Sequence, residues 1–74
     1  MTDHRLQELA NEVAEEVRQT FKDFAIERVK RVDSVLHITF RWPEPERLQV
    51  SINLHEHDSE EAVKAEIRRQ LRNS

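Results

Sequence analysis

The chain contains no glycine, and this absence restricts the turns and the sites that it can build. At average usage, roughly five glycines would be expected in a chain of this length. Glycine supplies positive φ in tight turns, and it lets the backbone approach a ligand or wrap a phosphate group closely. We therefore expect turns made from Asp, Asn, Ser and Pro, and no phosphate-binding loop, dinucleotide fingerprint or nucleophile elbow.

The length fits one domain, residues 1–74. Without cysteine there is no disulfide and no thiolate metal site, and a reducing cytoplasm fits this composition, although the sequence leaves localisation open. The polar N-terminus predicts no signal peptide, and no apolar run is long enough to span a membrane. The net charge of −3 does not favour nonspecific binding to nucleic acid or anionic lipid.

The N-terminal third of the chain predicts an amphipathic helix. We expect Thr2 or Asp3 as its N-cap and an end near Lys22 or Asp23. Apolar residues recur at steps of three and four along one face: Leu6, Leu9, Ala10, Val13, Val17, Phe21 and Phe24.

Three strands are predicted after Ala25, where β-branched residues become frequent. The second and third strands alternate apolar and polar residues, so each buries one face. A two-residue turn at Asp33-Ser34 pairs Val32 with Val35, and a proline-containing turn over residues 43–46 joins the second strand to the third. The apolar set of these two strands is Leu36, Ile38, Phe40 and Trp42, then Leu48, Val50, Ile52 and Leu54.

The first strand is irregular, because Ile26, Val29 and Val32 cannot all face one way in a regular strand. Either a β-bulge resets the alternation or some of these residues lie on the outer side, and we favour a bulge near Glu27 or Arg28. The charges on this strand indicate a sheet edge that is protected from further pairing.

The C-terminal segment predicts a second helix. Asp58 is the expected N-cap, and Glu61 three residues later completes a capping box. The order α-β-β-β-α predicts an α+β, two-layer fold, in which both helices pack on one face of a three-stranded antiparallel meander. The apolar stripe of the helix is Val63, Ile67 and Leu71, and the expected aromatic cluster of the core is Phe21, Phe24, Phe40 and Trp42.

One cluster has the residue types of a metal site. If the third strand continues, His55 and His57 share its outer face, with His37 across the sheet, while Glu56 points away and Asp58 serves as a cap. A closed site needs four supported ligands. We therefore predict no metal and no cofactor.

The uncovered sheet face is a second candidate, as a surface for a partner. Sheet-based RNA readers place aromatic side chains on such a face, and none is expected to point outward here. Basic residues of the first two strands (Arg28, Lys30, Arg31 and Arg41) could contact phosphates, although acidic segments flank them. The expected outward residues are His37, Thr39, Arg41, Gln49, Ser51, Asn53 and His55, and all but Gln49 are the possible partner-binding residues.

No catalytic centre is predicted. The carboxylates with clear positions lie on solvated helix faces, and no Ser-His-Asp arrangement follows from the spacing. A chain this short also lacks the room for a deep pocket beside a full core. We therefore expect that the protein is not an enzyme.

The element order resembles that of the double-stranded-RNA-binding domain, and the likeness covers most of the chain. That family carries a Gly-Pro-x-His loop between its first two strands, where this chain has Asp33-Ser34. It also begins its last helix with lysines, where this chain has the acidic run Ser59-Glu60-Glu61-Ala62. RNA binding is therefore not carried over to any residue.

The chain also resembles computationally designed small α/β proteins, because its caps, helix-end charges, strand alternation and proline turn all agree with one fold. This resemblance implies a designed or engineered scaffold: a stable monomer with no evolved biochemical activity and no required partner. The alternative is a small natural interaction module that uses the polar sheet face or the edge of the first strand. A second alternative is nucleic-acid binding through Arg and Lys of the first two strands.

Overall fold

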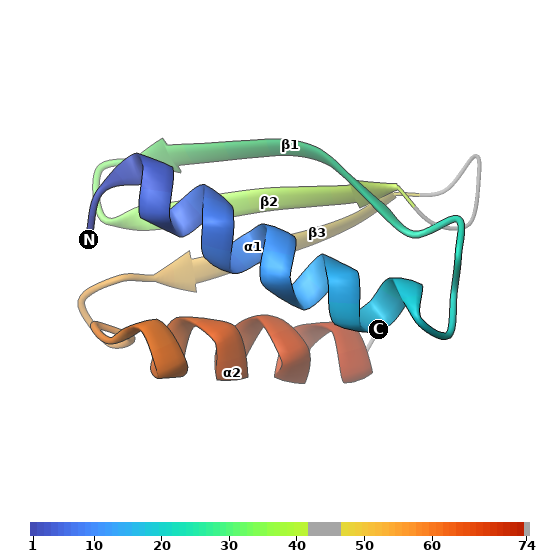
Figure 1. Cartoon of the computed structure of the whole chain (residues 1–74). Helices are drawn as coiled ribbons and strands as arrows, with labels where there is room; N and C mark the ends of the chain where they lie inside the picture. The colour runs from blue at the N-terminus through green and yellow to red at the C-terminus, as the bar shows by residue number, and fades with distance from the viewer. Residues whose placement is uncertain (42–46, 74) are drawn as a thin grey trace.

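The computed structural model has two layers, a three-stranded antiparallel sheet and two helices that cover one of its faces (Figure 1). It describes residues 1–41 and 47–73. The strand order β1-β2-β3 is a meander, so the predicted α+β fold is confirmed. Among the described residues, no helix is long and apolar enough to cross a membrane. The elements are α1 (Asp3–Arg18), β1 (Ala25–Val32), β2 (Val35–Arg41), β3 (Arg47–Asn53) and α2 (Glu60–Arg72).

The core lies between the two layers, and the rings of Phe24 and Phe40 stack in it with centroids 4.8 Å apart. The prediction that Phe21 joins this cluster is wrong, because Phe21 is 44% exposed. Trp42, the fourth expected member, lies outside the described residues, as does the predicted proline turn. The core comprises Leu6, Leu9, Ala10, Val13, Ala14, Phe24, Leu36, Ile38, Phe40, Val50, Ile52, Val63 and Ile67.

α1 begins as expected and ends earlier than expected. The Thr2 hydroxyl accepts a hydrogen bond from the Arg5 amide at 3.1 Å, which makes Thr2 the N-cap. The helix ends at Arg18, before the predicted Lys22 or Asp23. The amides of Thr20 and Phe21 both donate to the carbonyl of Val17, so the chain tightens and turns toward β1. This turn takes Phe21 off the apolar face of the helix.

The predicted bulge in β1 is confirmed. Ile26 pairs with Phe40 and Arg28 with Thr39, which leaves Glu27 as the extra residue. Ile26 and Val29 consequently both pack against the core, whereas Val32 is 44% exposed.

The turn between β1 and β2 is confirmed too, since Val32 pairs with Val35 across Asp33-Ser34. Asp33 has a φ of 56°, a left-handed conformation that Asp tolerates better than most residues. The turn thus forms without glycine.

α2 begins one residue later than predicted. The N-cap is Ser59, whose hydroxyl accepts from the Ala62 amide at 3.1 Å, and the prediction of Asp58 is wrong. Either side chain suits a cap. β3 ends at Asn53, and residues 54–56 form a turn before the helix.

Candidate interaction surfaces

The side of the sheet that faces away from the helices, here called the outer face, carries most of the predicted binding residues. His37 lies between Lys30 of β1 and Ser51 of β3 in the strand register. Its Nδ1 atom is 3.1 Å from the Ser51 hydroxyl oxygen. Five predicted residues share this face: His37, Thr39, Arg41, Ser51 and Asn53.

His55 does not belong to the outer face, which corrects the sequence prediction. It lies in the turn after β3, where its amide donates to the Asn53 side chain at 2.9 Å. The sequence predicts His55 and His57 on one face only if β3 continues that far, and β3 ends at Asn53. Within residues 1–41 and 47–73, no three His, Cys, Asp or Glu side chains group in a way that could hold a metal ion.

The outer face is predominantly basic. Among the residues that the structure describes there, Arg28, Lys30, Arg41 and Arg47 are basic and Glu27 is acidic, and Glu27 forms an ion pair with Arg47. Arg28 and Lys30 form no ion pair with any described residue. A shallow groove of about 250 Å³ crosses this face and is lined by Arg28, Lys30, Val32, His37, Thr39 and Gln49.

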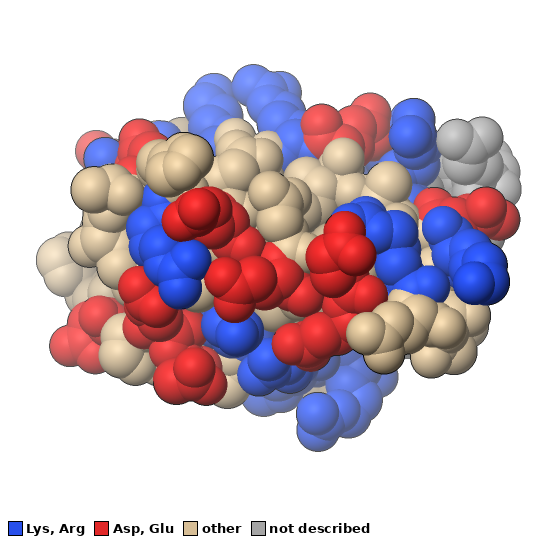
Figure 2. Space-filling model, in the orientation of Figure 1, with Lys and Arg blue, Asp and Glu red and all other residues tan. Residues whose placement is uncertain are grey.

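The helical face, formed by the surfaces of α1 and α2 that point away from the sheet, has a different charge pattern. Figure 2 shows acidic and basic side chains intermixed over it. Three ion pairs join the two helices there: Arg5–Glu60 at 2.7 Å, Lys64–Glu12 at 2.9 Å and Arg68–Glu16 at 2.8 Å.

These contacts stabilise the ionised carboxylates of the helical face. Hydrogen bonds from the basic partners on the other helix hold the pKa values of Glu12, Glu16 and Glu60 below the ordinary value. Within α2, hydrogen bonds from Arg69 and then from Gln70 lower the pKa of Glu66 to about 2. These four carboxylates are thus paired with groups of the same molecule.

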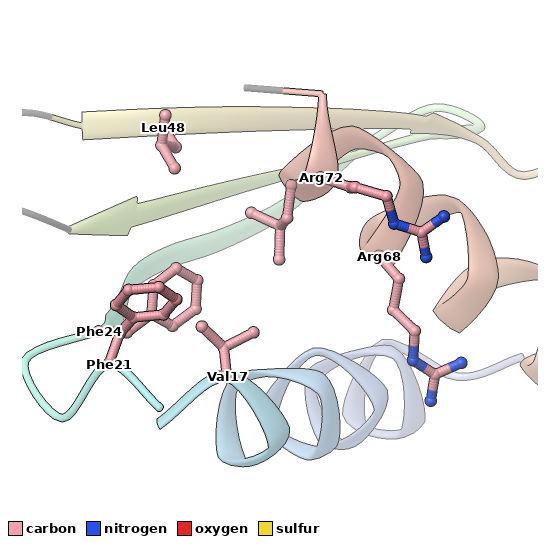
Figure 3. A pocket seen from close by; sticks show the side chains of 7 residues that line it. Val17, Phe21, Phe24, Leu48, Arg68 and Arg72 are labelled. Atoms are coloured by element: carbon pink, nitrogen blue, oxygen red, sulfur yellow. The ribbon is translucent and has the colours of Figure 1, made fainter. Parts of the chain in front are cut away.

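A pocket that sequence reasoning missed lies at the C-terminal ends of the helices. Its volume is about 400 Å³. Figure 3 shows the Phe21 and Phe24 rings on one side of it, with the guanidinium groups of Arg68 and Arg72 directed away from them. The pocket is therefore lined by apolar groups and by the aliphatic parts of the arginines. A binding site for a small molecule normally adds a few convergent polar groups, which these side chains do not supply.

One indirect signal for this pocket is present in the sequence. Val17 and Leu71 are the last residues of the apolar stripes within two helices that lie side by side, and both line the pocket. Phe21 lies after the end of α1 at Arg18, and it lines the pocket from there. The periodicity of the sequence does not predict that end of the helix.

Comparison with known proteins finds no match to this chain among family models, curated protein sequences or solved structures.

Proposed function

We propose that the protein is a small interaction module whose outer face binds an acidic segment of a partner protein. One observation carries the proposal: Arg28 and Lys30 are side by side on β1, point outward and form no ion pair with any described residue. Opposite charges on an approaching partner would be attracted to them, which increases the association rate and selects against basic partners.

The difference in charge pattern between the two faces supports a binding role for the outer face. A surface built only for solubility mixes both signs of charge, as the helical face does. Among the described strand residues of the outer face, four are basic (Arg28, Lys30, Arg41 and Arg47) and one, Glu27, is acidic. This excess of positive charge is opposite in sign to the net charge of the whole chain, which is −3.

A protein partner is favoured over a nucleic acid by the chemistry of the same face. Sequence-tolerant binding of single strands uses aromatic side chains on which bases stack. The strand residues described on the outer face include no Phe, Tyr or Trp, and Phe24 and Phe40 are buried on the other side.

The experiment compares two charge reversals of equal size. Lys30→Glu changes the outer face, whereas Lys22→Glu changes an exposed lysine in the turn after α1. Fluorescence anisotropy follows binding of a labelled peptide of alternating Glu and Val and, separately, of labelled oligo(U). Lys30→Glu is expected to weaken peptide binding by about fivefold or more, and Lys22→Glu by no more than about twofold.

Other outcomes count against this function. Equal loss in both variants would mean that the peptide senses only net charge. Tighter, steeply salt-dependent binding of oligo(U) would favour the nucleic-acid alternative. No binding of either probe at low salt would overturn the proposal and favour the scaffold.

The scaffold without evolved activity remains the competing proposal, and the agreement between local and global structure supports it. Thr2 and Ser59 cap the two helices, acidic residues lie in both first turns, and basic residues lie in both last turns. Such consistency is a criterion of design. Under this function the Lys30→Glu variant would behave like the Lys22→Glu control.

A further inference from the structure

The two edges of the sheet differ, because a side chain of α2 closes the β3 edge. The Ser51 amide donates to the Gln70 side-chain oxygen at 3.3 Å, and the Gln70 side-chain nitrogen donates to the Ser51 carbonyl at 2.8 Å. The Gln70 carboxamide therefore makes the two hydrogen bonds that a neighbouring strand would make. An unpaired edge is normally protected in some such way from pairing with another chain.

In the part of the chain that the structure describes, the β1 edge has no equivalent contact. Val32 pairs with Val35 across a two-residue turn, and hydrogen-bonded pairs alternate along antiparallel strands. The backbone of Lys30 is therefore hydrogen-bonded to β2, whereas the amides and carbonyls of Val29 and Arg31 point toward the edge. The same alternation points Ser51 toward Gln70 on the other edge, which agrees with the observed bonds. Among the described residues, no hydrogen bond reaches the backbone of Val29 or Arg31 from the edge side.

The segment that is free to pair is short and lies beside the basic groups. The bulge at Glu27 interrupts regular pairing, which leaves residues 28–32 as the continuous edge. Arg28 and Lys30 point to the outer face along this segment. On the inner side, a pocket of about 90 Å³ lies between α1 and the sheet, lined by Asp3, Leu6, Gln7, Val29, Arg31 and Leu36.

We propose that the acidic partner segment binds as an additional antiparallel strand along residues 28–32 of β1. This inference rests on the proposed function and specifies its geometry. Alternate side chains of the added strand would lie opposite Arg28 and Lys30 on the outer face, where carboxylates form favourable cross-strand pairs. The intervening side chains would lie on the inner side, beside Val29 and the small pocket there.

A second copy of the protein is a poor occupant of this edge. Antiparallel pairing of β1 with itself would bring Arg28 and Lys30 of each copy close to those of the other on one face. Like charges on directly opposite positions destabilise a pair of strands. The charges that exclude self-association therefore favour an acidic strand.

The test uses two isomeric peptides that differ only in which amides can donate. In an antiparallel complex with Glu on the outer face, the Val amides of an alternating Glu-Val peptide face β1 and the Glu amides face away. N-methylation of the Val residues is expected to weaken binding by about tenfold or more, since it removes several hydrogen bonds. N-methylation of the Glu residues, which keeps charge and composition, is expected to change binding by less than about threefold.

Amide hydrogen exchange gives an independent readout. With the unmodified peptide bound, exchange of the Val29 and Arg31 amides should slow, while that of Lys30, already bonded to β2, should change little. Equal effects of both methylation patterns, with no protection at Val29, would overturn strand addition and leave the proposed function intact. Failure of the unmodified peptide to bind would overturn the proposed function itself.

Discussion

Thr2 and Ser59 start the two helices with the same chemistry, a hydroxyl oxygen that accepts an amide hydrogen bond three residues ahead. At α2 the neighbouring Asp58 offers an equally suitable side chain, and the sequence pattern does not separate the two. The backbone decides between them, because Ser59 has the extended conformation of an N-cap, with φ −117° and ψ 160°.

The assignment of the cap can be measured directly. Ser59→Ala should lower the free energy of unfolding by about 1 kcal/mol, the usual cost of losing an N-cap. Asp58→Ala should cost less than about half of that, because among the described residues no hydrogen bond joins the Asp58 side chain to the helix end, and a nearby negative charge contributes less than a cap. Urea denaturation of both variants gives the comparison, and a larger loss for Asp58→Ala would contradict the structural assignment.

The bulge in β1 is the feature at the scale of the element that lets Ile26 and Val29 face the same layer. Regular alternation would turn one of them outward, and the extra residue Glu27 corrects the phase.

Deleting Glu27 should leave a regular strand in which Ile26 and Val29 still face the core. The expected loss in unfolding free energy is about 1 kcal/mol, mainly from its ion pair with Arg47. Deleting Lys30 instead turns Val29 outward and Arg28 inward, and it should cost at least about 2 kcal/mol. Chemical denaturation of the two deletion variants distinguishes them, and equal losses would mean that Glu27 is not the bulged residue.

The success of sequence reasoning differed between elements for a physical reason. β2 could be predicted because Leu36, Ile38 and Phe40 alternate strictly, and one face of the strand is fully buried. The end of α1 could not, because Phe21 continues the helical period after the backbone has left the helix at Arg18. Periodicity reports which residues are apolar, and it does not report where the chain must turn to reach the next element.

At the scale of the whole molecule, the contacts that sequence reasoning missed are those between elements. Gln70 reaches Ser51, and Arg5 reaches Glu60, only because α2 packs beside both β3 and α1. Nothing in the local pattern of either helix indicates these partners. The outer face was predictable in contrast, since His37, Thr39 and Ser51 follow from strand alternation alone.

The ion pairs across the helical face predict how the whole fold responds to acid. The pKa values of Glu12, Glu16 and Glu60 are lowered in the folded state from an ordinary 4.5, so their stabilisation is complete above that pH and is lost as the pH falls. The pKa of Glu66 is lowered to about 2, so the stabilisation from this carboxylate persists further into acid. The free energy of unfolding should therefore decrease as the pH is lowered through this window, and added salt should reduce the effect.

A variant with Gln at positions 12, 16 and 60 isolates this contribution. It should be less stable than the wild type at neutral pH, and the difference should shrink toward zero in acid, where the wild-type carboxylates are also uncharged. Glu56→Gln is the control, because Glu56 is exposed and forms no ion pair with any described residue. Urea denaturation from pH 7 down to about pH 2 measures all three proteins. If the deficit of the triple variant stayed constant across that range, the contacts between the helices would be acting through packing and not through charge.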